Sequence, residues 1–132
     1  MSSVFADTSA WYALISPRDT HHAAATTFLQ THPGTFLTTN YVVAETANLL
    51  LYRLGATSAL EFLAILGESR LVEVLCLSAE QHERAAALFA QLASKGLSFT
   101  DCSSVLVMQE QQLTHAFCFD QDFSRAGLAC VP

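Results

Sequence analysis

Charged residues are scarce in this sequence, and positively charged ones are the scarcest. Of 132 residues only 6 are Lys or Arg, against 12 Asp and Glu, so the net charge is −6 at pH 7. Proteins that bind nucleic acid through a broad surface are usually basic, and this composition argues against such a surface. Hydrophobic residues make up 52 %, which is typical of a compact globular chain. We expect one domain over residues 1–132.

Several other signals are missing. No apolar run reaches about 18 residues, so we expect no membrane span. The N-terminus has no basic segment followed by an apolar one, so a secretion signal is not expected and the cytoplasm is the default location. The four cysteines, Cys76, Cys102, Cys118 and Cys130, form no C-x-x-C pair. We expect all four to be reduced, mostly as small core residues, and not to bind zinc.

Short apolar segments alternate with helical patterns along the chain. Strands are predicted at residues 4–7, 35–38, 71–77, 115–119 and 128–131, and the main helices at 9–15, 20–29, 41–54, 58–68, 79–94 and 102–112. The expected N-caps are Asp19 or Thr20, Asn40, Thr57 or Ser58, Ser78, and Thr100 or Asp101. Gly55 and Gly96 are expected to end helices. Short apolar strands between helices predict an α/β fold, a three-layer α/β/α sandwich with a central parallel sheet.

Carboxylates stand where the apolar segments end. Asp7 ends the first predicted strand, and Asp120 comes at the end of the fourth, directly after residues 115–119, with Asp122 two residues later. Asp101 opens the helix that leads into the fourth strand, and Glu45 lies one turn inside a largely apolar helix. Because open parallel sheets bind ligands at the carboxyl ends of their strands, we expect these acids to meet at one edge.

Each acid also has a simpler interpretation. Asp7 and Asp101 suit helix caps, Glu45 could lie on a solvated stripe, and Asp120 and Asp122 could be turn residues. Their joint fit to one sheet edge favours a functional site.

Converging carboxylates repel one another unless a divalent cation lies between them. Mg²⁺ prefers oxygen ligands and keeps several waters, so we expect Asp7 and one of Asp101 or Asp120 to bind it directly, and Glu45 to act partly through water. Such an ion supports phosphodiester hydrolysis. Without it, at least one acid should have a pKa raised by like-charge repulsion. Whether one or two ions bind is open.

Four segments resemble the PIN domain family, and within it the VapC-like toxin ribonucleases. The resemblance covers essentially the whole chain and lies in residues 5–11, 38–45, 97–103 and 116–123. It implies a PIN-like α/β/α fold and endoribonuclease activity that depends on Mg²⁺ or Mn²⁺.

The resemblance also implies roles for individual residues. The acidic quartet would be Asp7, Glu45, Asp101 and Asp120, with Asp7, Asp101 and Asp120 as metal ligands and Asp122 as a possible sharer or substitute at the fourth position. Thr8, Ser9 and Ser103 would be polar supports. The implied partners are an RNA substrate, a second copy in a homodimer and, for a toxin, an antitoxin whose tail plugs the site.

Other residues have weaker signals. His21 and His22 are expected at a helix start or in packing, and Tyr12 in the core or a dimer interface, with base stacking as the alternative. The arginines are dispersed, and one or two of them are expected near phosphate without the sequence saying which.

Two other functions are considered. A haloacid-dehalogenase-type phosphatase needs the pattern D-x-D-x-T after its first strand, and Ser9 replaces the second acid here. The alternative from another class is a catalytically silent PIN-like module that binds RNA or protein, and the intact quartet argues against it.

Overall fold

The structure is a computed structural model that describes residues 3–132. Its centre is a five-stranded sheet in the order β3-β2-β1-β4-β5, in which every neighbouring pair is parallel. The strands are β1 (Ser3–Ala6), β2 (Thr35–Thr39), β3 (Val72–Leu75), β4 (His115–Phe117) and β5 (Ala129–Val131). All five predicted strands are present, and most are shorter than predicted.

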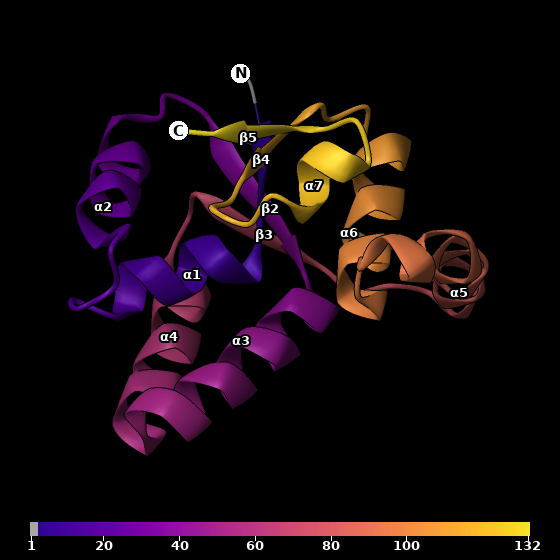
Figure 1. Cartoon of the computed structure of the whole chain (residues 1–132). Coiled ribbons are helices and arrows are strands. Elements are labelled where there is room, and N and C mark those ends of the chain that lie inside the picture. The colour runs from indigo at the N-terminus through magenta and orange to yellow at the C-terminus, as the bar shows by residue number, and fades with distance from the viewer. Residues whose placement is uncertain (1–2) are drawn as a thin grey trace.

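Helices fill the connections between the strands. They are α1 (Thr8–Ile15), α2 (His22–Thr31), α3 (Asn40–Leu54), α4 (Ala56–Glu68), α5 (Ala79–Leu92), α6 (Phe99–Glu110) and α7 (Asp122–Arg125), with a 3₁₀ turn at Ala93–Lys95. Figure 1 shows α2 on one side of the sheet, α6 and α5 on the other, and the α3–α4 hairpin extending away from it. The predicted three-layer α/β/α sandwich is confirmed.

The central position of β1 in the sheet explains why this strand is apolar. Phe5 and Ala6 of β1 are fully buried, because β2 and β4 flank the strand and helices cover its faces. On the neighbouring strands, Phe36 and Phe117 are also fully buried, and the ring of Phe28 from α2 packs 6.2 Å and 4.7 Å from theirs. This aromatic cluster fixes α2 against the middle of the sheet.

A buried polar link fixes α1 to the same strands. The indole Nε1 of Trp11 donates to Thr38 Oγ1 at 3.4 Å, and Thr38 Oγ1 donates to the carbonyl of Ala6 at 2.9 Å. Trp11 and Thr38 are both almost fully buried. The start of α1, immediately after β1, is therefore held in a defined orientation.

Two predicted N-caps in the α3–α4 hairpin are wrong. Thr39, not Asn40, caps α3 by accepting from the Val42 amide, and Asn40 Oδ1 instead accepts from the Leu77 amide at 3.0 Å. The helix α4 begins directly after Gly55, without a side-chain cap from Thr57 or Ser58. Residue type alone is therefore not sufficient to locate these two caps.

The predicted N-caps of α2 and α6 are also wrong. The N-cap of α2 is His21, with no side-chain cap bond, while Asp19 Oδ1 accepts from the His21 amide just before it. Ser98 caps α6, and it precedes the predicted caps by two or three residues. Ser78 caps α5 as predicted, and Gly55 and Gly96 end their helices at φ values of 102° and 88°.

The prediction of four reduced cysteines is wrong for one pair. Cys118 and Cys130 form a disulfide, with Cα atoms 5.5 Å apart, whereas exposed Cys76 and buried Cys102 are free. Residues 118 and 130 meet because β5 pairs with β4, where Phe117 lies opposite Val131. No helix in the described residues 3–132 is long and apolar enough to cross a membrane.

Candidate active site

A pocket of about 340 Å³ opens at the carboxyl ends of β1 and β4. From β1 the chain builds the sheet in one direction through β2 and β3, and β4 and β5 lie on the other side. Such a switch point is where open parallel sheets bind ligands. The pocket is lined by Asp7, Thr8, Ser9, Tyr12, Asp19, His21, Glu45, Leu49, Arg53, Asp101, Phe119 and Asp120.

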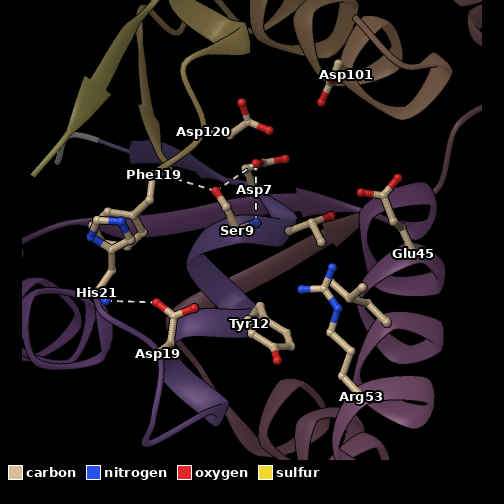
Figure 2. Close-up of a pocket in the computed structure, with 12 residues that line it drawn as sticks. Asp7, Ser9, Tyr12, Asp19, His21, Glu45, Arg53, Asp101, Phe119 and Asp120 are labelled. Carbon is tan, nitrogen blue, oxygen red and sulfur yellow. Dashed lines mark hydrogen bonds between the residues drawn. The ribbon is translucent and has the colours of Figure 1, made fainter.

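Asp7 lies at the base of this pocket and is only 3 % exposed. It is the N-cap of α1, and its Oδ2 accepts from the Ser9 hydroxyl at 3.0 Å and the Ser9 amide at 3.4 Å. Ser9 Oγ in turn accepts from the Phe119 amide at 3.0 Å. Ser9 therefore connects the Asp7 carboxylate, through two hydrogen bonds, to the segment that follows β4, as the dashed lines of Figure 2 show.

The pKa of Asp7 is raised from 3.8 to about 7: burial is the largest cause, the nearby charge of Asp101 adds to it, and hydrogen bonds from Thr8 and Ser9 oppose the shift. The sequence predicted a raised pKa from like-charge repulsion. The direction is confirmed, but burial is the larger cause.

Asp101 reaches the pocket from the first turn of α6. Ser98 Oγ accepts from the Asp101 amide at 3.0 Å, and Asp101 Oδ2 accepts from the Ser98 amide at 2.9 Å, which makes a capping box. Burial raises the pKa of Asp101, the bonds to Ser98 lower it, and the charges of Asp120 and Glu45 raise it again. Asp101 is therefore not the N-cap of α6, but it completes the capping box, and its side chain also lines the pocket.

The structure separates Asp120 from Asp122. Asp120 lines the pocket together with Asp7 and Asp101, and Figure 2 draws the three carboxylates around the same space. Asp122 is not among the lining residues, and its Oδ1 pairs with Arg125 Nη1 at 3.1 Å. Burial, followed by the charges of Asp120 and Asp101, raises the pKa of Asp122 to about 6 despite Arg125. Asp120 is therefore better placed for the fourth acidic position.

Glu45 enters the pocket from α3 and is half-buried. Leu49 and Arg53, four and eight residues further on, line the same pocket. Residues spaced by four lie on one face of a helix, so this stripe of α3 forms one wall.

The three expected polar supports lie in different surroundings. Thr8 and Ser9 line the pocket, and the buried Thr8 Oγ1 has no hydrogen-bond partner among the described residues. Ser103 is fully buried in α6, where its hydroxyl donates to the Thr100 carbonyl at 2.7 Å, and it is not among the lining residues. Ser103 therefore contributes to the packing and hydrogen bonding of α6.

The donor set fits a hard cation that keeps part of its water shell. Within residues 3–132, no three His, Cys, Asp or Glu side chains are close enough to hold one ion together. The pocket nevertheless offers carboxylate oxygens and the unpartnered Thr8 hydroxyl. Mg²⁺ binds proteins through one or two carboxylates with water completing its shell, so these residues fit that ion.

Sequence reasoning missed several lining residues. The i+4 and i+8 spacing from Glu45 was the available signal for Leu49 and Arg53. His21, predicted as a helix-start or packing residue, lies in the pocket wall, and its ring stacks on Phe119 with centroids 4.4 Å apart. That contact joins residues almost a hundred positions apart, and no local pattern reveals it.

Comparisons with known proteins agree with this fold. The family model for the PIN domain matches residues 4–128. The 23S rRNA-specific endonuclease VapC20 of Mycobacterium tuberculosis is 35 % identical over 128 residues, covering 97 % of both chains. The crystal structure of VapC20, described as a sarcin-ricin loop cleaving toxin, has a TM-score of 0.89 at 33 % identity, again covering 97 % of each chain.

A more distant structure shares the fold alone. FitAcB from Neisseria gonorrhoeae has a TM-score of 0.71 at 14 % identity, covering 98 % of this chain and 96 % of its own. The family-model match and the 35 % identity to VapC20 each extend over nearly the entire sequence. This chain belongs to the PIN domain family.

Proposed function

We propose that this protein is an endoribonuclease that hydrolyses RNA phosphodiester bonds and depends on Mg²⁺ or Mn²⁺. One observation carries the proposal: Asp7, Glu45, Asp101 and Asp120, from four separate segments, line a single pocket. In the described part of the chain, neither of the two ion pairs includes any of these acids. Asp7 and Asp101 are buried, Glu45 is half-buried and Asp120 is exposed. Buried carboxylates without a compensating charge are costly in the absence of a cation.

In this proposal Asp7, Asp101 and Asp120 hold the ion, directly or through its waters. A bound divalent ion lowers the pKa of a water and polarises the phosphoryl oxygen. The chain holds these acids with fixed partners, because Ser9 anchors Asp7 and the Ser98 amide anchors one oxygen of Asp101. Such anchoring reduces the reorganisation needed during the reaction.

Glu45 and Thr8 would act on water and substrate. The carboxylate of Glu45 points into the same space as that of Asp7 in Figure 2. There it would accept a hydrogen bond from the attacking water and orient it. The free hydroxyl of Thr8 would donate to a substrate oxygen or to a bound water, which satisfies its unused hydrogen-bonding capacity.

Ribosomal RNA is the first substrate to test. VapC20 is named as a 23S rRNA-specific endonuclease, and this chain is similar to it over 97 % of both lengths. VapC20 is also described as a toxin that cleaves the sarcin-ricin loop, and we therefore propose that loop as the candidate target.

Purified ribosomes and protein-free rRNA are incubated with the protein in Mg²⁺, in Mn²⁺ and in EDTA, and cleavage sites are mapped by primer extension. We expect cleavage in Mg²⁺ or Mn²⁺, none in EDTA, and none by Asp7→Asn. Glu83→Gln, on the exposed face of α5, removes one acid outside the pocket and serves as the control. Cleavage that persists in EDTA contradicts the metal dependence. A folded protein that binds RNA but never cleaves it supports the silent module.

We further propose a cytoplasmic toxin that forms a homodimer and has a cognate antitoxin. The exposed apolar side chains support a protein interface: six of them lie on α3 and α4, namely Leu51, Tyr52, Leu54, Leu60, Leu63 and Ile65. Light scattering tests the dimer. Expression should arrest growth, and co-expression of a short neighbouring gene should relieve the arrest; absence of arrest by an expressed, folded protein contradicts the toxin role.

A further inference from the structure

Arg53 is the one Lys or Arg side chain among the described residues that line the acidic pocket. It extends from the last turn of α3, and its guanidinium lies 5.3 Å from the centroid of the Tyr12 ring. In Figure 2 the guanidinium lies between Tyr12 and Glu45, at the side of the pocket next to the acids. A positive charge is thus set in the wall of a strongly acidic pocket.

The hydrogen-bond donors of Arg53 are not used within the described chain. The two ion pairs of residues 3–132 are Arg84–Glu110 and Arg125–Asp122, and no side-chain hydrogen bond in that range has Arg53 as donor. A guanidinium presents several N–H groups in a planar fork that matches two oxygens of a phosphate. The Tyr12 ring supports one face of the fork and leaves its edge available.

A purely structural explanation accounts for only part of this arrangement. A cation in the last turn of a helix interacts favourably with the helix dipole, and that alone would favour Arg at position 53. It does not require that the side chain contact Tyr12 or line the same pocket as Glu45, Asp7 and Asp101.

We propose that Arg53 binds a backbone phosphate of the RNA strand, and that Tyr12 is a positioning residue that holds the guanidinium in place. This inference rests on the proposed function, because it assigns the same pocket to an RNA substrate. A chain with net charge −6 and five carboxylates around the pocket repels phosphate. A guanidinium at the rim attracts the phosphate beside the acids. Without it, the bound cation would be the only source of that attraction.

Binding is measured separately from cleavage. The probe is a fluorescein-labelled single-stranded RNA oligonucleotide of mixed sequence, titrated by anisotropy at several salt concentrations in Mg²⁺, with Asp7→Asn in every protein to prevent cleavage. Arg53→Gln should weaken binding by about tenfold, the loss expected for a charge-assisted hydrogen bond. It should also reduce the slope of log Kd against log salt by about 0.7, which corresponds to one phosphate contact on a single strand.

Matched variants separate this role from loss of charge or fold. Arg70→Gln removes the same charge from an exposed residue outside the pocket. It should leave Kd within about twofold of the parent value and the salt slope within about 0.3 of the parent slope. Arg53→Lys should keep the salt slope and lose affinity, because the ammonium lacks the fork. Tyr12→Leu should weaken binding, and Tyr12→Phe, which keeps the ring, should bind more tightly than Tyr12→Leu. Thermal unfolding confirms that each variant is folded.

The cleavage assay distinguishes failure of this inference from failure of the proposed function. With Asp7 restored, Arg53→Gln should raise KM for RNA more than it lowers kcat, as expected for lost substrate binding. If the unaltered protein cleaves RNA while Arg53→Gln and Arg70→Gln match in KM and salt slope, the phosphate role is refuted and the nuclease proposal stands. If the slope depends on Arg53 but no cleavage occurs, Arg53 binds phosphate and the nuclease proposal fails.

Discussion

Replacing Asp7 with Asn should stabilise the metal-free protein while abolishing its proposed activity. Asp7 is 3 % exposed, and its pKa is raised from 3.8 to about 7, chiefly by burial. At about 1.4 kcal/mol for each pKa unit, a shift of about three units corresponds to about 4 kcal/mol of destabilisation when the group is ionised. Asn has nearly the same shape, keeps an oxygen to accept from Ser9, and carries no charge. We expect a gain of about 2 to 4 kcal/mol above pH 8.

The pH dependence of this gain has a defined sign. Below about pH 3.8 the carboxyl is protonated in both states, and it costs nothing. As the pH rises from about 4 to 7, the unfolded chain ionises while folded Asp7 keeps its proton, so the free energy of unfolding falls. Above pH 7 the loss is complete. The stability difference between Asp7→Asn and the unaltered protein should therefore grow from near zero at pH 4 to its full value at pH 8.

Urea denaturation in EDTA, at intervals from pH 4 to pH 8, measures the difference. Other titrating groups, such as Asp122, are present in both proteins and largely cancel. Glu83→Gln is the control for removal of one exposed negative charge. In Mg²⁺ the difference should shrink, because an ion that binds only the folded state stabilises the protein that retains Asp7. A stability difference that is independent of pH would refute this account of the Asp7 environment.

Three further changes test the placement of neighbouring groups. Asp120→Asn should lower kcat/KM for RNA by more than about tenfold, and by more than Asp122→Asn does, because only Asp120 lines the pocket; a larger effect at Asp122 would reverse the assignment. Ser98→Ala removes the bond from the Asp101 amide to Ser98 Oγ and should lower the free energy of unfolding by about 1 kcal/mol, measured in urea. It should also reduce cleavage, because the first turn of α6, which carries the Asp101 carboxylate, is held less firmly; unchanged cleavage would show that this bond is dispensable for the site. Thr38→Val leaves a buried indole N–H and a strand carbonyl without their partner and should cost about 1 to 3 kcal/mol; a neutral effect in urea would show that water replaces the hydroxyl.

The sequence predicts those features that depend on short segments. An apolar run followed by an acid places Asp7 after β1, and the alternation of strands and helices predicts a parallel sheet with covered faces. The rule for carboxyl ends of strands then brings Asp7 and Asp120 to one pocket. Local sequence pattern and a general topological rule are therefore sufficient to predict the parallel sheet and the meeting of Asp7 and Asp120.

Features that depend on contacts between distant segments could not be predicted. The disulfide requires that β5 pair with β4 in a given register, which spacing alone does not reveal. The cap of α6 was misplaced because Ser98, Thr100 and Asp101 are all favourable cap residues, and only the path of the chain selects among them. The contact between Arg53 of α3 and Tyr12 of α1 likewise joins two separate helices, and no local pattern predicts it.

The strand order has a consequence for when the site can form during synthesis. Asp7 is synthesised well before β4, yet its backbone amide donates to the carbonyl of Phe117, and Ser9 accepts from the amide of Phe119. These contacts span about 110 residues, so β1 cannot gain its second neighbour until β4 has left the ribosome. A nascent chain that stops short of Asp120 lacks both an acid and the link that orients Asp7. Incomplete translation products that end before Asp120 therefore lack the assembled site.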